Sequence, residues 1–198
     1  MLFQIVFIYI SKYYKYYKYK KQHKATILFI YKMDFWYDLE LLIMNEEGKQ
    51  AAAFYKNEYN RSDSNAGFDL HSSEDVLVEQ IPQFIPFGIV ARLIKVQPMP
   101  GGTSNDYLKT DSHFWLMCRS SIYKTGLIMG NSTGIIDKSY RGELKAPVWS
   151  MTANSQVTRG DRLFQIVAPD MGWIRNIRVV NSMPNTERGV GGFGSTGK

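Results

Sequence analysis

Residues 131–151 read Asn-Ser-Thr-Gly-Ile-Ile-Asp-Lys-Ser-Tyr-Arg-Gly-Glu-Leu-Lys-Ala-Pro-Val-Trp-Ser-Met, and they give the clearest indication of the fold. Apolar stretches at 134–136 and 143–151 flank a polar segment that contains glycine, serine and aspartate, a composition typical of a turn between strands. We expect a β-hairpin over 131–143 that carries Asp137 and Tyr140 on its far side.

The same alternation of short apolar stretches and turn residues continues on both sides of this segment. Turn compositions such as Asn-Glu-Glu-Gly at 45–48 and Thr-Arg-Gly-Asp at 158–161 separate the stretches. Apart from a short stretch after Arg119, no segment keeps a helical period over three turns. The pattern therefore predicts an all-β barrel or sandwich. The expected strands are Leu39–Met44, Val76–Gln80, Gly88–Val96, Phe114–Cys118, Leu127–Met129, Gly134–Ile136, Glu143–Met151, Leu163–Ala168 and Ile177–Val180.

The net charge of +6 comes from the first 32 of the 198 residues. They contain seven lysines and no acid, and subtracting these seven from the 24 basic residues leaves 17 against 18 acidic residues. Three interpretations of residues 1–32 stay open: a disordered and dispensable extension, with a true start at Met33; an arm that binds a membrane surface or nucleic acid; and an extra strand. Because the charge follows the apolar run and no small-residue cleavage site appears, a secretion signal is not expected.

Composition excludes several classes of protein. One cysteine cannot build a disulfide framework or a thiolate zinc site, and the three histidines lack metal-ligand spacing. No apolar run reaches the ~18 residues of a membrane-spanning helix. The terminal stretch Gly192–Lys198 matches the phosphate-loop pattern G-x-x-x-x-G-K, but that pattern needs a following helix and the chain ends at the lysine. A glycine-rich arm that cradles phosphate and a plain polar tail both remain open.

Three other clusters contain charged or hydrogen-bonding residues, but none of them identifies a function when taken alone. Ala66-Gly-Phe-Asp-Leu70 places a carboxylate after a glycine turn, and Arg119-Ser-Ser121 offers three donors suited to oxyanions. Arg159-Gly-Asp-Arg-Leu-Phe-Gln165 is a turn followed by a strand. Together with 131–143 and the terminal arm, they make five clusters.

In order and spacing, these five clusters resemble the five motifs of the homotrimeric dUTP pyrophosphatases (dUTPases), over about Ala66 to Lys198. The resemblance implies a distorted, jelly-roll-like antiparallel β-barrel, with the C-terminal arm exchanged between the subunits of a trimer. The implied organisation is a Lys/Tyr-rich extension at 1–32, a barrel domain at 33–186 and an arm at 187–198 that closes the active site.

The resemblance also implies a role for individual residues. Asp137 matches the catalytic carboxylate that orients and deprotonates the attacking water, and Tyr140 matches the tyrosine under the deoxyribose. Asp69 matches the aspartate that holds Mg²⁺ through water. The implied uracil-binding positions are Asn131, Ile135, Ile136 and Lys145; the implied phosphate-binding positions are Arg119, Ser120, Ser121, Gln165 and Arg188; in the arm, Phe193 would stack on uracil and Gly194, Ser195 and Thr196 would close over the phosphates.

The implied reaction is Mg²⁺-assisted hydrolysis of dUTP to dUMP and pyrophosphate by attack of water at the α-phosphorus, which keeps uracil out of DNA and supplies dUMP for dTMP synthesis. A cytoplasmic protein is expected, with a nuclear one also open, and neither nucleic acid nor a membrane span is required. Two rivals are a dCTP deaminase, which would lack this hairpin and arm, and a catalytically idle nucleotide-binding regulator.

Overall fold

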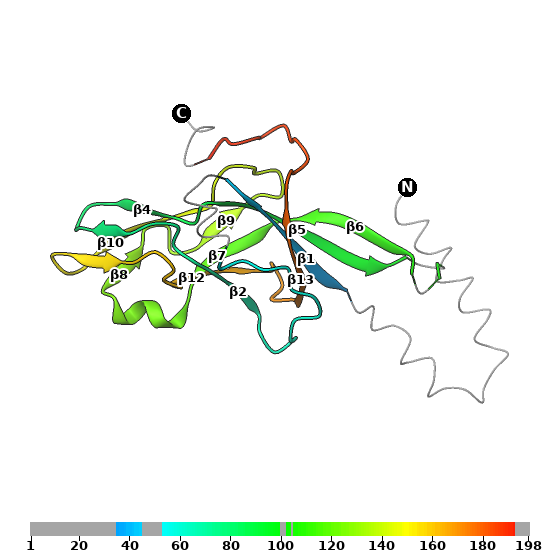
Figure 1. Ribbon diagram of the computed structural model, residues 1–198, viewed down its shortest axis with the longest axis horizontal. Coiled ribbons are helices and arrows are strands. Elements are labelled where there is room, and N and C mark those ends of the chain that lie inside the picture. Colours follow the sequence, from blue (N-terminus) through cyan, green and yellow to red (C-terminus); the bar gives the residue numbers. More distant parts are fainter. Residues whose placement is uncertain (1–34, 45–52, 100–101, 104, 193–198) are drawn as a thin grey trace, which may run out of the picture. The chain divides into compact units, whose positions relative to one another are not determined.

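Short β-strands dominate the part of the chain that the computed structural model describes, residues 35–44, 53–99, 102–103 and 105–192 (Figure 1). The strands are β1 (Trp36–Ile43), β2 (Gly67–Leu70), β3 (Val76–Val78), β4 (Gln83–Pro86), β5 (Ile89–Pro98), β6 (Tyr107–Ser112), β7 (Phe114–Cys118), β8 (Leu127–Met129), β9 (Gly134–Ile136), β10 (Lys145–Ser150), β11 (Ser155–Val157), β12 (Phe164–Val167) and β13 (Ile174–Val180). A 3-10 helix, η1 (Ser120–Lys124), follows β7 where the sequence indicated a short helical stretch. The all-β prediction is confirmed.

The strands form four sheets, with the orders β13-β1-β5-β6, β4-β10-β8, β11-β3 and β2-β12-β7-β9. All pairings between named strands are antiparallel except β1 with β13, which run parallel. Neighbouring strands are mostly not consecutive in the chain, so the chain crosses repeatedly between sheets, as it does in jelly-roll-like folds.

The expected hairpin over 131–143 is not a two-stranded ladder. Strand β9 pairs with β7, whereas β10 pairs with β4 and β8 in another sheet. The segment Asp137–Leu144 is therefore a connection between two sheets. Because each of its two flanking strands finds its partner elsewhere in the chain, local turn composition could not reveal this arrangement.

One hydrophobic core joins the sheets. In β10 the buried residues alternate with partly exposed ones, so that Ala146, Val148 and Ser150 point inward, as expected for a sheet that is covered on one face. The largest fully buried side chains of the core include Tyr37, Leu39, Leu41, Leu70, Ile85, Phe87, Ile89, Leu93, Leu116, Leu144, Phe164 and Ile166. Truncating one such leucine to alanine costs about 2–5 kcal/mol.

An ion-pair network ties the sheet of β5 and β6 to the connection after β9. Arg92 contacts Glu40 at 3.1 Å and Asp111 at 2.6 Å, and Asp111 also contacts Arg141 at 3.2 Å. The Arg141 guanidinium donates to the carbonyl oxygens of Lys138 and Tyr140, at 2.8 and 2.9 Å. The side chain of Arg141 is only 9% exposed, so this network holds the connection firmly against the sheet.

The predicted extension at 1–32 lies outside the described residues, and its three interpretations stay predictions. Among the described residues, no helix has the length and apolar character needed to cross a membrane.

Candidate active site

A pocket of about 190 Å³ lies beside the connection that follows β9, and it is called here the β9 pocket. Strand β9, the connection itself, the start of β10 and the segment after β13 all contribute to its wall. Of the residues predicted from the sequence, it is lined by Asn131, Ile135, Ile136, Asp137, Tyr140, Lys145 and Arg188. Residues that are 57 positions apart, from Asn131 to Arg188, thus meet in one cavity.

Tyr140 is fixed inside this pocket by its own turn. Its backbone N–H donates to the Asp137 carbonyl at 2.9 Å, and its hydroxyl donates to the Glu143 carbonyl at 3.0 Å. Burial raises the pKa of the Tyr140 phenol, so the ring stays neutral. A Cβ at Gly142 would lie 2.4 Å from the Tyr140 hydroxyl oxygen, so only glycine permits this close approach.

The pocket wall also carries the predicted Lys145, together with Glu143, which the sequence did not indicate as a site residue. Lys145 Nζ lies 2.8 Å from Glu143 Oε2, and this hydrogen bond raises the pKa of the lysine, which stays protonated. The other Glu143 oxygen accepts the Gly88 N–H at 3.1 Å. Glu143 therefore anchors Lys145 beside the pocket, leaving the lysine 38% exposed.

Asp137 forms an ion pair with Arg188 and lies beside His113. Arg188 Nη1 contacts Asp137 Oδ2, and His113 Nδ1 lies 3.3 Å from Asp137 Oδ1. The Arg188 guanidinium is itself positioned by donating Nε–H to the Gly191 carbonyl at 2.9 Å. With 38% of its side chain exposed, Asp137 is a fixed carboxylate that still reaches solvent. A carboxylate in this state suits the acceptance of a proton from water.

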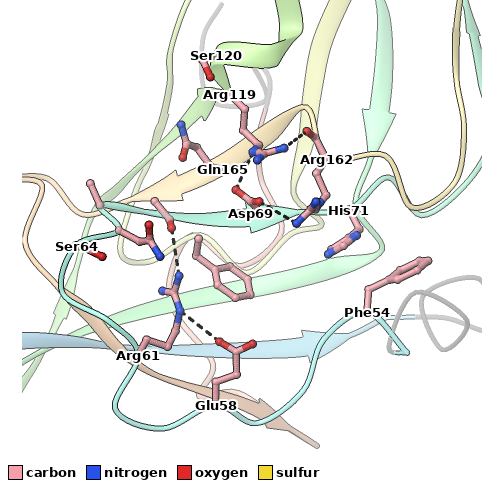
Figure 2. A pocket seen from close by; sticks show the side chains of 14 residues that line it. Phe54, Glu58, Arg61, Ser64, Asp69, His71, Arg119, Ser120, Arg162 and Gln165 are labelled. Carbon is pink, nitrogen blue, oxygen red and sulfur yellow. Dashed lines mark hydrogen bonds and ion pairs between the residues drawn. The ribbon is translucent and has the colours of Figure 1, made fainter.

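A second pocket, of about 620 Å³, lies beside β2 and is called here the β2 pocket (Figure 2). Asp69 and Gln165 line it from directly opposite positions on the paired strands β2 and β12. The Gln165 amide donates to the Cys118 carbonyl at 3.1 Å and passes over Gly67, where a Cβ would lie 1.9 Å from Gln165 Oε1. Glycine at 67 is thus required for the observed position of this side chain.

Figure 2 shows two arginines converging on Asp69. Arg119 Nε lies 2.8 Å from Asp69 Oδ1, and Arg162 Nη1 lies 3.5 Å from Oδ2. Arg119 also donates to the Arg162 carbonyl at 2.7 Å. Ser120, at the start of η1, completes this side of the pocket. Two guanidinium groups and a hydroxyl make a cluster suited to phosphate oxygens.

Another part of the β2 pocket comes from residues outside the five sequence clusters, among them Phe54, His71 and Arg61. The Phe54 ring stacks on the His71 ring, with centroids 4.7 Å apart and planes at 7°. His71 Nδ1 lies 3.0 Å from the Gly160 carbonyl oxygen, and burial lowers the pKa of this histidine. Arg61, paired with Glu58 at 3.3 Å, lines the pocket in the lower part of Figure 2.

The donor set fits a hydrated metal better than a directly bound one. Within the described ranges, no three His, Cys, Asp or Glu side chains gather closely enough to hold a metal ion. Asp69 is the carboxylate of the β2 pocket's arginine cluster and is already paired. Mg²⁺ prefers oxygen ligands and keeps several waters when it is bound to phosphates, so one carboxylate that acts through water is sufficient.

The predicted residues thus divide between two pockets of one chain. The β2 pocket receives Asp69, Arg119, Ser120 and Gln165, while Ser121 lies in η1 and lines neither pocket. Phe193, Gly194, Ser195 and Thr196 lie outside the described residues, so their roles stay predictions.

Comparisons with known proteins match this chain to one family. The family model for dUTPase matches residues 110–197. The chain is 36% identical over 144 residues to the deoxyuridine 5'-triphosphate nucleotidohydrolase of Paramecium bursaria Chlorella virus 1, covering 69% of this chain and 86% of that protein. It is 30% identical over 135 residues to the protein of the same name from Serratia proteamaculans (strain 568), covering 67% and 81%.

Solved structures with some likeness include the dUTPase of phage phi11 of S. aureus, described with a structural Mg(II) ion. It has a TM-score of 0.43 at 21% identity and covers 65% of this chain and 88% of its own. The native EIAV dUTPase has a TM-score of 0.40 at 21% identity and covers 55% and 78%. Because the chain covers more than four fifths of two relatives that are at least 30% identical to it, it belongs to the dUTPase family.

Proposed function

We propose that this dUTPase hydrolyses dUTP to dUMP and pyrophosphate, with the β9 pocket holding the nucleoside and the β2 pocket supplying phosphate contacts. The observation that carries the proposal is the meeting of Asp137 and Tyr140 with residues of β9 in one cavity of about 190 Å³. Membership of the dUTPase family indicates the substrate. The pocket brings together a carboxylate that can act as a base, a tyrosine ring for the sugar and a lysine cation.

Uracil would be recognised by backbone groups between Asn131 and Ile136, in the manner of a Watson–Crick partner. Cytosine presents the opposite order of donors and acceptors, which would leave buried polar groups unpaired at ~1–3 kcal/mol each. The side chain of Leu116 leaves little space here, since a Cβ at Gly134 would already lie 3.1 Å from its Cβ. This narrow wall supports exclusion of the thymine methyl group.

Tyr140 would pack under the deoxyribose. Its hydroxyl is engaged with the Glu143 carbonyl and its ring is held by the turn, so it cannot move aside for a 2′-hydroxyl. The proposed selectivity for deoxyribose over ribose is therefore steric.

Asp137 would orient the attacking water and accept its proton, and the water would attack the α-phosphorus in line with the leaving pyrophosphate. Arg119, Ser120, Ser121 and Gln165 would contact phosphate oxygens. Arg188 would reach the γ-phosphate through the part of its guanidinium that does not contact Asp137. Asp69 would hold Mg²⁺ through water, and the ion would supply charge neutralisation on the triphosphate.

A homotrimer is the proposed assembly. The nucleoside residues and most of the phosphate residues line separate pockets of one chain, so a complete site needs the β9 pocket of one subunit to meet the β2 pocket of another. Large apolar side chains such as Leu77, Phe84 and Ile128 are 37–50% exposed, which suits burial between subunits. The described part of the C-terminal segment contacts its own chain at Asp137, and exchange of the arm is proposed for residues beyond it. The single cysteine, a free thiol, suits the proposed cytoplasmic location.

Pyrophosphate release from dUTP, dCTP, dTTP and UTP tests the proposal, each with Mg²⁺ and with a chelator. Release from dUTP alone that is lost with chelator is the expected result. Absence of release from every nucleotide, by a protein that sediments as a folded trimer, would overturn it in favour of the idle regulator. Release of ammonia from dCTP would favour the deaminase instead.

A further inference from the structure

The register of β7 and β9 places a histidine directly beside the proposed general base. These strands pair antiparallel, with Phe114 opposite Ile136 at the end of the ladder. The next residues along each strand, His113 and Asp137, consequently face each other one position beyond the last pair. This proximity follows from backbone pairing and does not depend on a flexible loop.

The contacts of His113 define two states of the site. Its Nδ1 accepts the Lys138 N–H at 3.3 Å and lies 3.3 Å from Asp137 Oδ1. A ring that accepts the Lys138 N–H carries no proton on Nδ1, so it has no proton to donate to the carboxylate. When Nδ1 is protonated, it must release the Lys138 amide and becomes a donor to Asp137 Oδ1.

The other titratable groups around His113 and Asp137 already have partners. Arg188 from the C-terminal segment holds Asp137 Oδ2, so Oδ1 is the oxygen left for water. Asp111, two residues before His113, is engaged by Arg92 and Arg141. The remaining titratable groups of the β9 pocket wall, Tyr140, Glu143 and Lys145, are engaged with one another or with backbone.

We propose that His113 is a positioning residue for dUTP hydrolysis: neutral, it leaves Asp137 Oδ1 free to bind the attacking water, and protonated, it captures that oxygen. The proposal rests on the proposed function, in which Asp137 is the base. It follows that histidine protonation, and not only carboxylate protonation, sets the acid limit of activity. The His113 side chain is 55% exposed, so solvent reaches the ring directly.

His113→Asn tests the proposal on the full chain. Asparagine keeps an oxygen that can accept the Lys138 N–H but cannot become a cation in the physiological range. We expect kcat of the unmodified enzyme to fall about tenfold between about pH 8 and about pH 5.5, and that of the variant to fall less than about twofold. Lys109→Gln, on the exposed part of β6, is the matched control and should keep the unmodified profile.

His113→Lys places a permanent cation at the same position and should lower kcat about tenfold at pH 8, where the asparagine variant is active. The proposal is overturned if kcat falls toward low pH in the same way in the asparagine variant and in the unmodified enzyme. It is also overturned if the variant loses activity equally at every pH and this acid limb of the profile does not move. Thermal melting of both variants confirms that each folds. Asp137→Asn distinguishes failure of the proposed role of Asp137 from failure of the proposed role of His113. If Asp137→Asn keeps turnover, the role of Asp137 is wrong. If Asp137→Asn is inactive while the acid limb of His113→Asn is unmoved, only the role of His113 is rejected.

Discussion

The Arg188 guanidinium and the Asp137 carboxylate form an ion pair although 51 positions separate them in the sequence. The pair joins the segment after β13 to the connection after β9 and fixes one carboxylate oxygen. Arg141 strengthens the same junction, because its backbone N–H donates to the Gly189 carbonyl at 2.7 Å and its side chain donates to the Pro184 carbonyl at 3.1 Å. The geometry of the proposed base is thus set by residues that are distant in sequence.

Replacing Asp137 with asparagine should lower kcat for dUTP by about 10²–10⁴-fold, because the amide cannot take the proton of the attacking water. Binding of dUTP, measured by calorimetry, should change by less than about tenfold, since Asp137 is not proposed to hold the base or sugar. Glu79→Gln is the control, because Glu79 is exposed and is not among the residues that line either pocket. A near-normal rate in Asp137→Asn contradicts the assigned role.

Truncation after Glu187 removes Arg188 and the whole glycine-rich stretch. We expect kcat/KM for dUTP to fall by about 10²-fold or more, because the γ-phosphate loses its arginine and the lid is gone. Arg188→Gln should show the smaller part of this loss, and Val190→Ala, at a side chain that is 75% exposed, should show none. If the truncated protein works as fast as the full chain, the arm does not close the site.

Two substitutions at Tyr140 separate its ring from its hydroxyl. Tyr140→Phe loses the hydrogen bond to the Glu143 carbonyl and should cost about 1 kcal/mol of unfolding free energy, with the preference for dUTP over UTP kept. Tyr140→Ala opens the pocket floor and should reduce the ratio of kcat/KM values for dUTP and UTP at least about tenfold. An unchanged ratio in the alanine variant would show that sugar selectivity arises elsewhere.

His71 should make the folded protein less stable in mild acid. Burial lowers its pKa below the ordinary value of 6.5, so between 6.5 and the lower folded value the unfolded chain binds more protons than the folded chain. The free energy of unfolding is therefore fully maintained above about pH 6.5 and declines as the pH falls through this window. Urea melts at about pH 7.5 and about pH 5.5 should show a smaller decline for His71→Gln than for the unmodified chain; an equal decline would place the acid sensitivity in other groups.

The strands that the sequence predicted are those with apolar, half-buried patterns. Phe114–Cys118, Leu127–Met129 and Gly134–Ile136 were predicted with their observed bounds, because each is apolar and lies between turn residues. Strand β6 was missed because its side chains at Tyr107–Thr110 are exposed on a sheet edge, where no apolar alternation is needed. Strand β11 was missed because two of its three residues, Ser155 and Gln156, are polar, so it forms no apolar stretch.

The sequence by itself determined the family of this protein and its candidate site residues. Five clusters in order identified the family, and they supplied Asp69, Asp137 and Tyr140, because a reaction on a fixed substrate restricts residue types at fixed spacings. The tertiary structure decided which of these groups meet. It separated Asp69 from Asp137 into two pockets and set His113 beside the proposed base through the pairing of β7 with β9. Strand pairing between distant segments depends on packing across the whole core, so no local pattern in the chain encodes it.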